Sequence, residues 1–294
     1  MQEAVSVRTE KEMMGLIIQT AKEDDRVLAA YLKGSRNNPN VPKDRYQDFD
    51  VMYVVRETKS FIADPAWLGR FGKIILKQEQ DDDFGYGDRF GIRSHYEQSY
   101  SWLLLFADGN RIDIGVETVA AMEKGTNRNK LFLPLLDKAG CLPELPPPTD
   151  EDFHVTPPTA KQFRGCCNTF FWSLCDVAKG IARDELPFAM TTYHLPAHSM
   201  LQKMLGWYIG IHTGYSVSCG KLNKYFKKYL PEGIYLQYLK TYPDSSYAHF
   251  WDAIDVSCAL FHQTAQFVAE RSGYPYPQGD EDGFYRYAGM IKKR

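Results

Sequence analysis

The chain has 294 residues, enough for two domains that each bury a hydrophobic core. Hydrophobic residues make up 44% and charged residues 24%, a composition that is ordinary for a soluble globular protein and excludes a disordered or fibrous one. The formal net charge of −2 lacks the positive field of a protein that follows a phosphate backbone, so we expect no long nucleic acid as substrate.

The sequence carries no signal for a membrane or for secretion. It contains no run of about 18 apolar residues, and its N-terminal stretch is polar and charged. We therefore expect a cytoplasmic protein with no membrane partner. The six cysteines include no Cys-x-x-Cys spacing, and we interpret them as buried thiols rather than as zinc ligands or disulfides.

The first part of the chain is predicted to form a mixed sheet with flanking helices. Thr9, followed three residues later by Glu12, is a capping-box signal for a first helix. Apolar, β-branched and aromatic runs predict strands over residues 27–32, 48–55, 73–77, 100–106 and 111–116. Asp108-Gly109 lies between the last two strands and predicts a hairpin turn.

Six prolines among acidic residues at 142–158 mark a domain boundary, because prolines block both a helix and an inner strand. We place the two domains at 1–145 and 146–294. Beyond the boundary, apolar residues recur at helical spacing and predict helices over residues 160–183, 199–212, 221–230 and 249–271. Trp172, Trp207 and Tyr208 lie on these apolar stripes, so we expect them in the core, with stacking on a substrate ring as the open alternative. The predicted fold class is α+β, with a mixed β-sheet and flanking helices first and a helical bundle second.

Three aspartates of the first domain form a candidate metal site. Asp48 and Asp50 are two residues apart in a predicted strand, so both side chains point to the same face while Phe49 faces the core. Asp113 has an isoleucine on each side and also points away from the apolar face. Three converging carboxylates need a cation, and their oxygen atoms suit Mg²⁺.

A candidate phosphate-binding turn follows the first predicted strand. Gly34 lets the backbone approach a phosphate closely, and the N–H and hydroxyl of Ser35 can donate hydrogen bonds to it. Arg36 is a candidate bidentate phosphate partner, and a solvated loop arginine is the open alternative. A single Asp-x-Asp is more often a solvent-facing strand edge. Its combination with this turn and the third aspartate favours nucleotidyl transfer, where catalysis consists mainly of positioning and of neutralising phosphate oxygens.

Several short segments carry a family resemblance. They are residues 8–12 (RTEKE), 34–36 (GSR), 47–50 (QDFD), 112–114 (IDI), 148–152 (PTDED), 166–168 (CCN), 214–216 (GYS) and 220–221 (GK). Gly-Ser, twelve residues and Asp-Phe-Asp resemble the signature of the polymerase-beta-like nucleotidyltransferase superfamily. The whole set, spread over nearly the full length, is similar to the bacterial aminoglycoside 6-adenylyltransferases that inactivate streptomycin.

The resemblance implies transfer of AMP from ATP, with Mg²⁺, to a hydroxyl of an aminoglycoside, above all streptomycin, with release of pyrophosphate and antibiotic resistance as the result. It implies an N-terminal nucleotidyltransferase domain and a C-terminal helical domain that binds substrate or nucleotide. In such families the carboxylates matching Asp48 and Asp50 bind the metal, the one matching Asp113 completes the site or activates the hydroxyl, and Lys221 is a candidate for the ATP phosphates. The implied partners are ATP and a cationic small-molecule acceptor, bound by a monomer.

The chain departs from the family pattern in its helical half. Thr191-Thr192 and Ser199 stand where family members carry an acidic residue and then an arginine. A substrate-activating carboxylate is then missing or replaced, and Glu185 is the candidate replacement; a helix-end surface acid is the commoner interpretation of that residue. The same chemistry on another small molecule, on a protein or on an RNA end therefore stays open as the alternative function.

Overall fold

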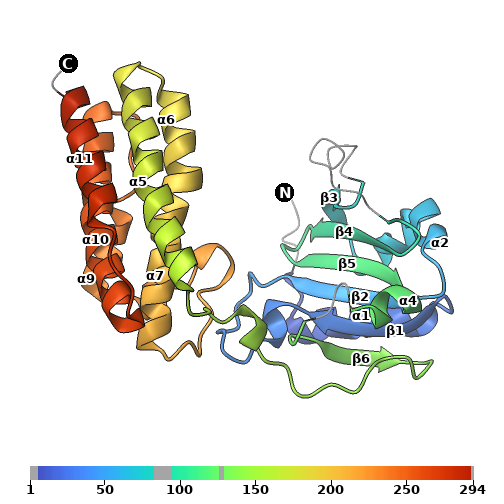
Figure 1. The fold of residues 1–294 in the computed structure, drawn as a ribbon. Coiled ribbons are helices and arrows are strands. Elements are labelled where there is room, and N and C mark those ends of the chain that lie inside the picture. The colour runs from blue at the N-terminus through green and yellow to red at the C-terminus, as the bar shows by residue number, and fades with distance from the viewer. Residues whose placement is uncertain (1–5, 83–94, 126–128, 293–294) are drawn as a thin grey trace. The chain divides into compact units, whose positions relative to one another are not determined.

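The structure, a computed structural model, describes residues 6–82, 95–125 and 129–292. The chain divides into two compact units, Met1–Asp152 and Phe153–Arg294, coloured blue to green and yellow-green to red in Figure 1. The first unit holds a mixed sheet with flanking helices and the second unit is helical, so the predicted α+β class is confirmed.

The proline-rich segment stays attached to the first unit through side chains near its end. Asp150 accepts hydrogen bonds from the amides of Asn38 (3.1 Å) and Asn40 (2.7 Å). Lys130 forms an ion pair with Glu151 at 2.9 Å. These contacts place the division between the units after Asp152.

Six strands in the described part of the chain form one sheet with the order β3-β4-β5-β2-β1-β6 (Figure 1). Their bounds are β1 Val27–Lys33, β2 Phe49–Val55, β3 Ile74–Glu79, β4 Ser99–Phe106, β5 Arg111–Thr118 and β6 Leu133–Asp137. Strands β2 and β5 pair in parallel and the other neighbours pair antiparallel. The first five lie within two residues of the predicted ranges. β6 was not predicted, because it is a half-exposed edge strand that contains a proline.

The described helices of the first unit are α1 Glu10–Glu23, α2 Lys59–Ala63 and α4 Val119–Glu123. The described helices of the second unit are α5 Ala160–Ala182, α6 Leu186–Thr192, α7 His198–His212, α8 Phe226–Tyr229, α9 Glu232–Leu239, α10 Tyr247–Ser272 and α11 Gln278–Lys292. Short 3₁₀ turns are η1 Ser35–Asn37, η2 Pro65–Phe71, η4 Glu151–Phe153 and η6 Lys221–Asn223, and η5 Tyr193–Ala197 is a π-helical turn. The predicted helix over 221–230 is wrong: only η6 and one turn of α8 form, because Leu222 and Asn223 have φ values of 55° and 61°. In the described part of the chain, no helix has the length and apolar character to cross a bilayer.

Helix α1 covers one face of the sheet, and a smaller apolar cluster with Tyr31, Met52 and Val54 covers part of the other face. The capping box is present: the N–H of Glu12 donates to the Thr9 hydroxyl, and the N–H of Thr9 donates to the Glu12 carboxylate at 2.7 Å. Met13 and Ile17 are fully buried in the cluster that also holds the alternate residues of β2. Since side chains alternate along a strand, the residues between them face the opposite side.

The second unit is built around α5, which starts with a capping box at Thr159. Helices α6, α7, α10 and α11 contact it. Phe170 on α5 stacks on Phe261 on α10 with ring centroids 3.9 Å apart. This apolar core is separate from the sheet's core, as the change of sequence period from two to 3.6 predicts.

Candidate active site

The parallel pairing of β2 and β5 brings two of the three predicted aspartates together. Asp50 is the register partner of Asp113. On the other side of β2, Lys33 at the end of β1 pairs with Asp50. The strand neighbours Phe49 and Ile112 point the other way and are 1% and 0% exposed. The two carboxylates therefore share the face that α1 does not cover.

The third aspartate is linked to this pair by an arginine. Asp48 directly precedes β2, and its Oδ1 lies 3.4 Å from Nε of Arg111. An Nη atom of the same guanidinium lies 3.4 Å from Oδ1 of Asp113. Burial, and then the charge of Asp48, raise the pKa of the Asp113 carboxyl, and Arg111 counteracts them. The sequence did not point to Arg111; its position two residues before Asp113 in an alternating strand was the available signal.

The turn after β1 lies directly against Asp50. Gly34 has a φ of 79°, a conformation that side chains strongly disfavour, and a Cβ built on it would lie 2.1 Å from Oδ2 of Asp50. Ser35 opens η1 next to it, and its carbonyl oxygen accepts a hydrogen bond from the Gln47 amide at 3.4 Å. A glycine is therefore required where the turn meets the carboxylate.

Arg36 is engaged by the protein itself. Its guanidinium group lies 3.7 Å from the centroid of the Phe49 ring and donates to the carbonyl oxygens of Gln47 (2.6 Å) and Asp48 (3.2 Å). It also pairs with Glu10 at 3.3 Å, and its residue is only 7% exposed. Arg36 thus fixes the segment that carries Asp48 into β2. Its predicted contact with a phosphate stays a prediction.

A metal ion fits the chemistry of the aspartates but not their present side-chain arrangement. Among the described residues, no group of three or more His, Cys, Asp or Glu side chains is arranged so that it could hold a metal ion. Asp48 and Asp113 share the guanidinium of Arg111 instead, so a cation already stands between them. The oxygen atoms of three carboxylates suit Mg²⁺, and the turn at Gly34 has no side chain that would fill the space beside Asp50. The ion can bind there once Arg111 has left Asp48 and Asp113. The three-aspartate magnesium site stays a prediction on these terms.

The candidate residues of the helical unit lie in two exposed segments. Lys221 begins η6 after Gly220, whose φ is 73°. Glu185 is exposed and precedes the first residue of α6. The predicted roles of Lys221 at the ATP phosphates and of Glu185 at the substrate stay predictions.

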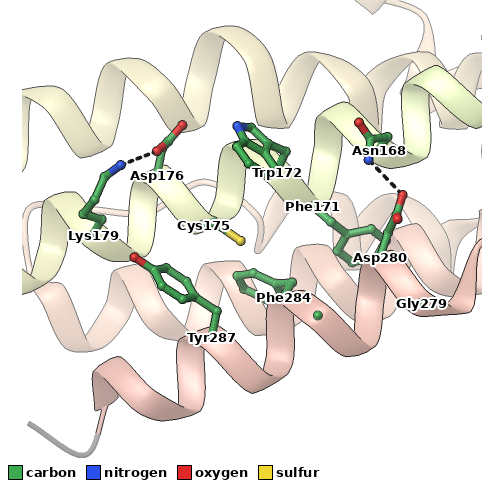
Figure 2. A pocket seen from close by; sticks show the side chains of 11 residues that line it. Asn168, Phe171, Trp172, Cys175, Asp176, Lys179, Gly279, Asp280, Phe284 and Tyr287 are labelled. Atoms are coloured by element: carbon green, nitrogen blue, oxygen red, sulfur yellow. Dashed lines mark hydrogen bonds and ion pairs between the residues drawn. The ribbon is translucent and has the colours of Figure 1, made fainter.

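The helical unit also contains a cavity of about 550 Å³ between α5 and α11 (Figure 2). None of the predicted site residues lines it. Trp172 stands on its wall and is 70% exposed, so the prediction that this residue packs in the core is wrong, whereas Trp207 is buried as predicted. Helix α5 buries both Phe170 and Phe171, and this leaves the next side chain pointing outward.

The raised pKa of Asp113 predicts a gain in stability when its charge is removed. The folded chain holds this proton more tightly than the unfolded chain, so the free energy of unfolding falls as the pH rises through the folded-state pKa, and the loss is complete above it. We expect metal-free Asp113→Asn to melt roughly 1–3 °C above the wild type at pH 7, and the difference to shrink toward pH 4. Thermal melts in a chelator check this. Asp25→Asn, a change at an exposed aspartate of the same unit, should show no such gain, and a less stable Asp113→Asn at pH 7 would contradict the prediction.

A Gly-Ser turn against one strand aspartate, a second aspartate just before that strand and a third on the parallel neighbour form the arrangement that the sequence predicts for a nucleotidyltransferase. The names of its relatives show that the protein is an enzyme of this class.

Comparison with known proteins specifies the family. The profile of the family described as "Streptomycin adenylyltransferase" matches residues 7–291, so the chain belongs to this family. The aminoglycoside 6-adenylyltransferase of Campylobacter jejuni is 34% identical over 94% of this chain and 93% of its own length. The enzyme of the same name from Bacillus subtilis strain 168 is 33% identical over 97% and 98%. A crystal structure of the aminoglycoside 6-adenyltransferase from Bacillus subtilis is 29% identical, covers 97% of this chain and 99% of its own, and has a TM-score of 0.47.

Proposed function

We propose that the chain transfers AMP from ATP to a hydroxyl of an aminoglycoside, with streptomycin as the first acceptor to consider, in the cytoplasm and with Mg²⁺. The relatives named aminoglycoside 6-adenylyltransferase support the class of acceptor. The residues of one sheet would hold the ion, so the reaction needs no second copy of the chain. We assign the sheet unit to nucleotidyl transfer and the helical unit to binding of acceptor or nucleotide.

In this reaction the acceptor oxygen attacks the α-phosphorus of ATP, the bond from that phosphorus to the bridging oxygen of pyrophosphate breaks, and the hydroxyl proton leaves to a base. Asp48, Asp50 and Asp113 would hold the divalent ion, which supplies positive charge against the phosphate oxygens. The backbone of Gly34 and the N–H and hydroxyl of Ser35 would donate hydrogen bonds to the triphosphate. Asp113 would either complete this set of ligands or, if it stays off the ion, accept the hydroxyl proton.

One observation carries this proposal: the register of the parallel strands β2 and β5 sets Asp50 beside Asp113, with Asp48 linked to Asp113 through Arg111. Carboxylates in such proximity repel one another unless a cation lies between them.

The test is an assay of the purified chain with Mg²⁺-ATP and a panel of aminoglycosides. We expect pyrophosphate release that depends on the acceptor and an AMP adduct of streptomycin in the mass spectrum. Pyrophosphate release with other acceptors while streptomycin stays unmodified would redirect the proposal to another acceptor. ATP binding without turnover on any acceptor would overturn it.

The helical unit favours a second class of acceptor, amino sugars with little or no positive charge. Thr191 and Thr192 carry no charge, and the hydroxyl of Ser199 at the start of α7 donates to the carbonyl oxygens of Leu195 and Pro196 in the preceding turn η5. These side chains cannot supply the acid and the arginine that the family resemblance implies. The acceptor panel should therefore include neutral and singly charged amino sugars beside streptomycin.

A further inference from the structure

Arg111 lies between two acidic side chains, Asp48 and Asp113, where β2 and β5 begin. Register pairs Phe49 with Ile112 across β2 and β5, so Asp48 and Arg111 stand opposite one another one step earlier. Arg111 is also two residues before Asp113 and lies on the same face of β5. The register of the two strands and the alternation of side chains along β5 therefore place the guanidinium group of Arg111 near both carboxylates.

The guanidinium group reaches both carboxylates at once. Its Nε and one Nη atom lie 3.4 Å from Asp48 and 3.4 Å from Asp113, respectively. These distances are longer than those of a tight bidentate pair, and the Arg111 side chain is 45% exposed. The contact is thus a loose, partly solvated ion pair with two carboxylates, which another cation can replace.

We propose that the guanidinium group of Arg111 competes with the divalent ion for the position between Asp48 and Asp113, and that it leaves both carboxylates when the ion enters. This inference rests on the proposed function, because it takes the three aspartates as the metal ligands. The departure of Arg111 from the two carboxylates is then part of every metal-binding event.

The proposal predicts an unusual result, a variant that binds metal more tightly. Removing one positive charge a few ångström from a divalent ion in a solvated site strengthens binding by roughly tenfold. We expect metal-free Arg111→Gln to bind Mn²⁺ about tenfold more tightly than the wild type, by calorimetry or by the loss of the free-ion electron paramagnetic resonance signal.

Two further variants separate charge from structure. Arg111→Lys keeps the charge without the planar fork, so its Mn²⁺ affinity should stay within roughly threefold of the wild type. Arg70→Gln is the matched control: Arg70 is 47% exposed, pairs with Glu23 at 3.9 Å in the same unit, and its removal changes the net charge by the same amount. It should leave Mn²⁺ affinity unchanged.

The outcomes distinguish this inference from the proposed function. Saturable Mn²⁺ binding by the wild type that is lost in Asp50→Asn, together with tighter binding by Arg111→Gln alone, supports both. Binding by the wild type with no tightening in Arg111→Gln overturns the role of Arg111 and leaves the metal site standing. Absence of saturable binding by the wild type overturns the metal site and the role of Arg111 with it.

Discussion

Asp50→Asn should reduce AMP transfer by about 10³-fold or more, equivalent to about 4 kcal/mol of transition-state stabilisation. Asp50 stands between the Gly34 turn and Asp113, so it is the carboxylate that joins the phosphate-binding turn to the metal ligands. Asparagine has nearly the same size and fits the same space, and the backbone pairing of β2 with β1 and β5 is untouched. The variant should therefore fold and melt as a single species.

The measurement is the initial rate of acceptor-dependent pyrophosphate release across a range of metal concentrations, with circular dichroism as the check of folding. Asp25→Asn removes an exposed carboxylate just before the opposite end of β1 and should retain full activity. If folded Asp50→Asn keeps more than a tenth of the wild-type rate at the same metal concentration, Asp50 is not a metal ligand.

Gly34→Ala should lower activity by about 10²-fold and destabilise the fold by roughly 1–3 kcal/mol. Two causes act together. The φ of 79° is unfavourable for any side chain, and the new Cβ would lie 2.1 Å from Oδ2 of Asp50, so the carboxylate has to rotate away. The loss of activity follows from the second cause, because a ligand displaced by about an ångström no longer serves its ion.

A control and a double variant separate the two causes. Gly109 has a nearly identical φ of 82°, and a Cβ built on it meets nothing within 4 Å, so Gly109→Ala should cost stability while retaining activity. Gly34→Ala placed on Asp50→Asn should cause little further loss, because both changes remove the same carboxylate. Rates that multiply in the double variant would show that Gly34 acts independently of Asp50.

The amino-acid pattern alone was sufficient for five of the six strands of the described residues, because each is a run of β-branched and aromatic residues closed by a turn signal. It was also sufficient for α5, α7 and α10, which are long and strongly periodic. It missed α11, where three glycines interrupt the helical pattern, and β6, an exposed edge strand whose burial is too slight to leave an alternating signal. Short elements such as η6 depend on backbone angles of single residues, which composition does not reveal.

Part of the candidate site could likewise be predicted from the sequence, and part could not. Alternation along one strand is a local property, so the sequence by itself determined that Asp48 and Asp50 leave the core face together and that Asp113 does the same on its own strand. Pairing between strands is a non-local property. Only the tertiary structure decided that β5 lies parallel to β2 with Asp50 opposite Asp113, that Gly34 meets the Asp50 carboxylate, and that Arg36 and Arg111 engage protein groups. The physical reason is that register and ion pairing are set by the packing of segments that are not neighbours in the sequence, which no local pattern encodes.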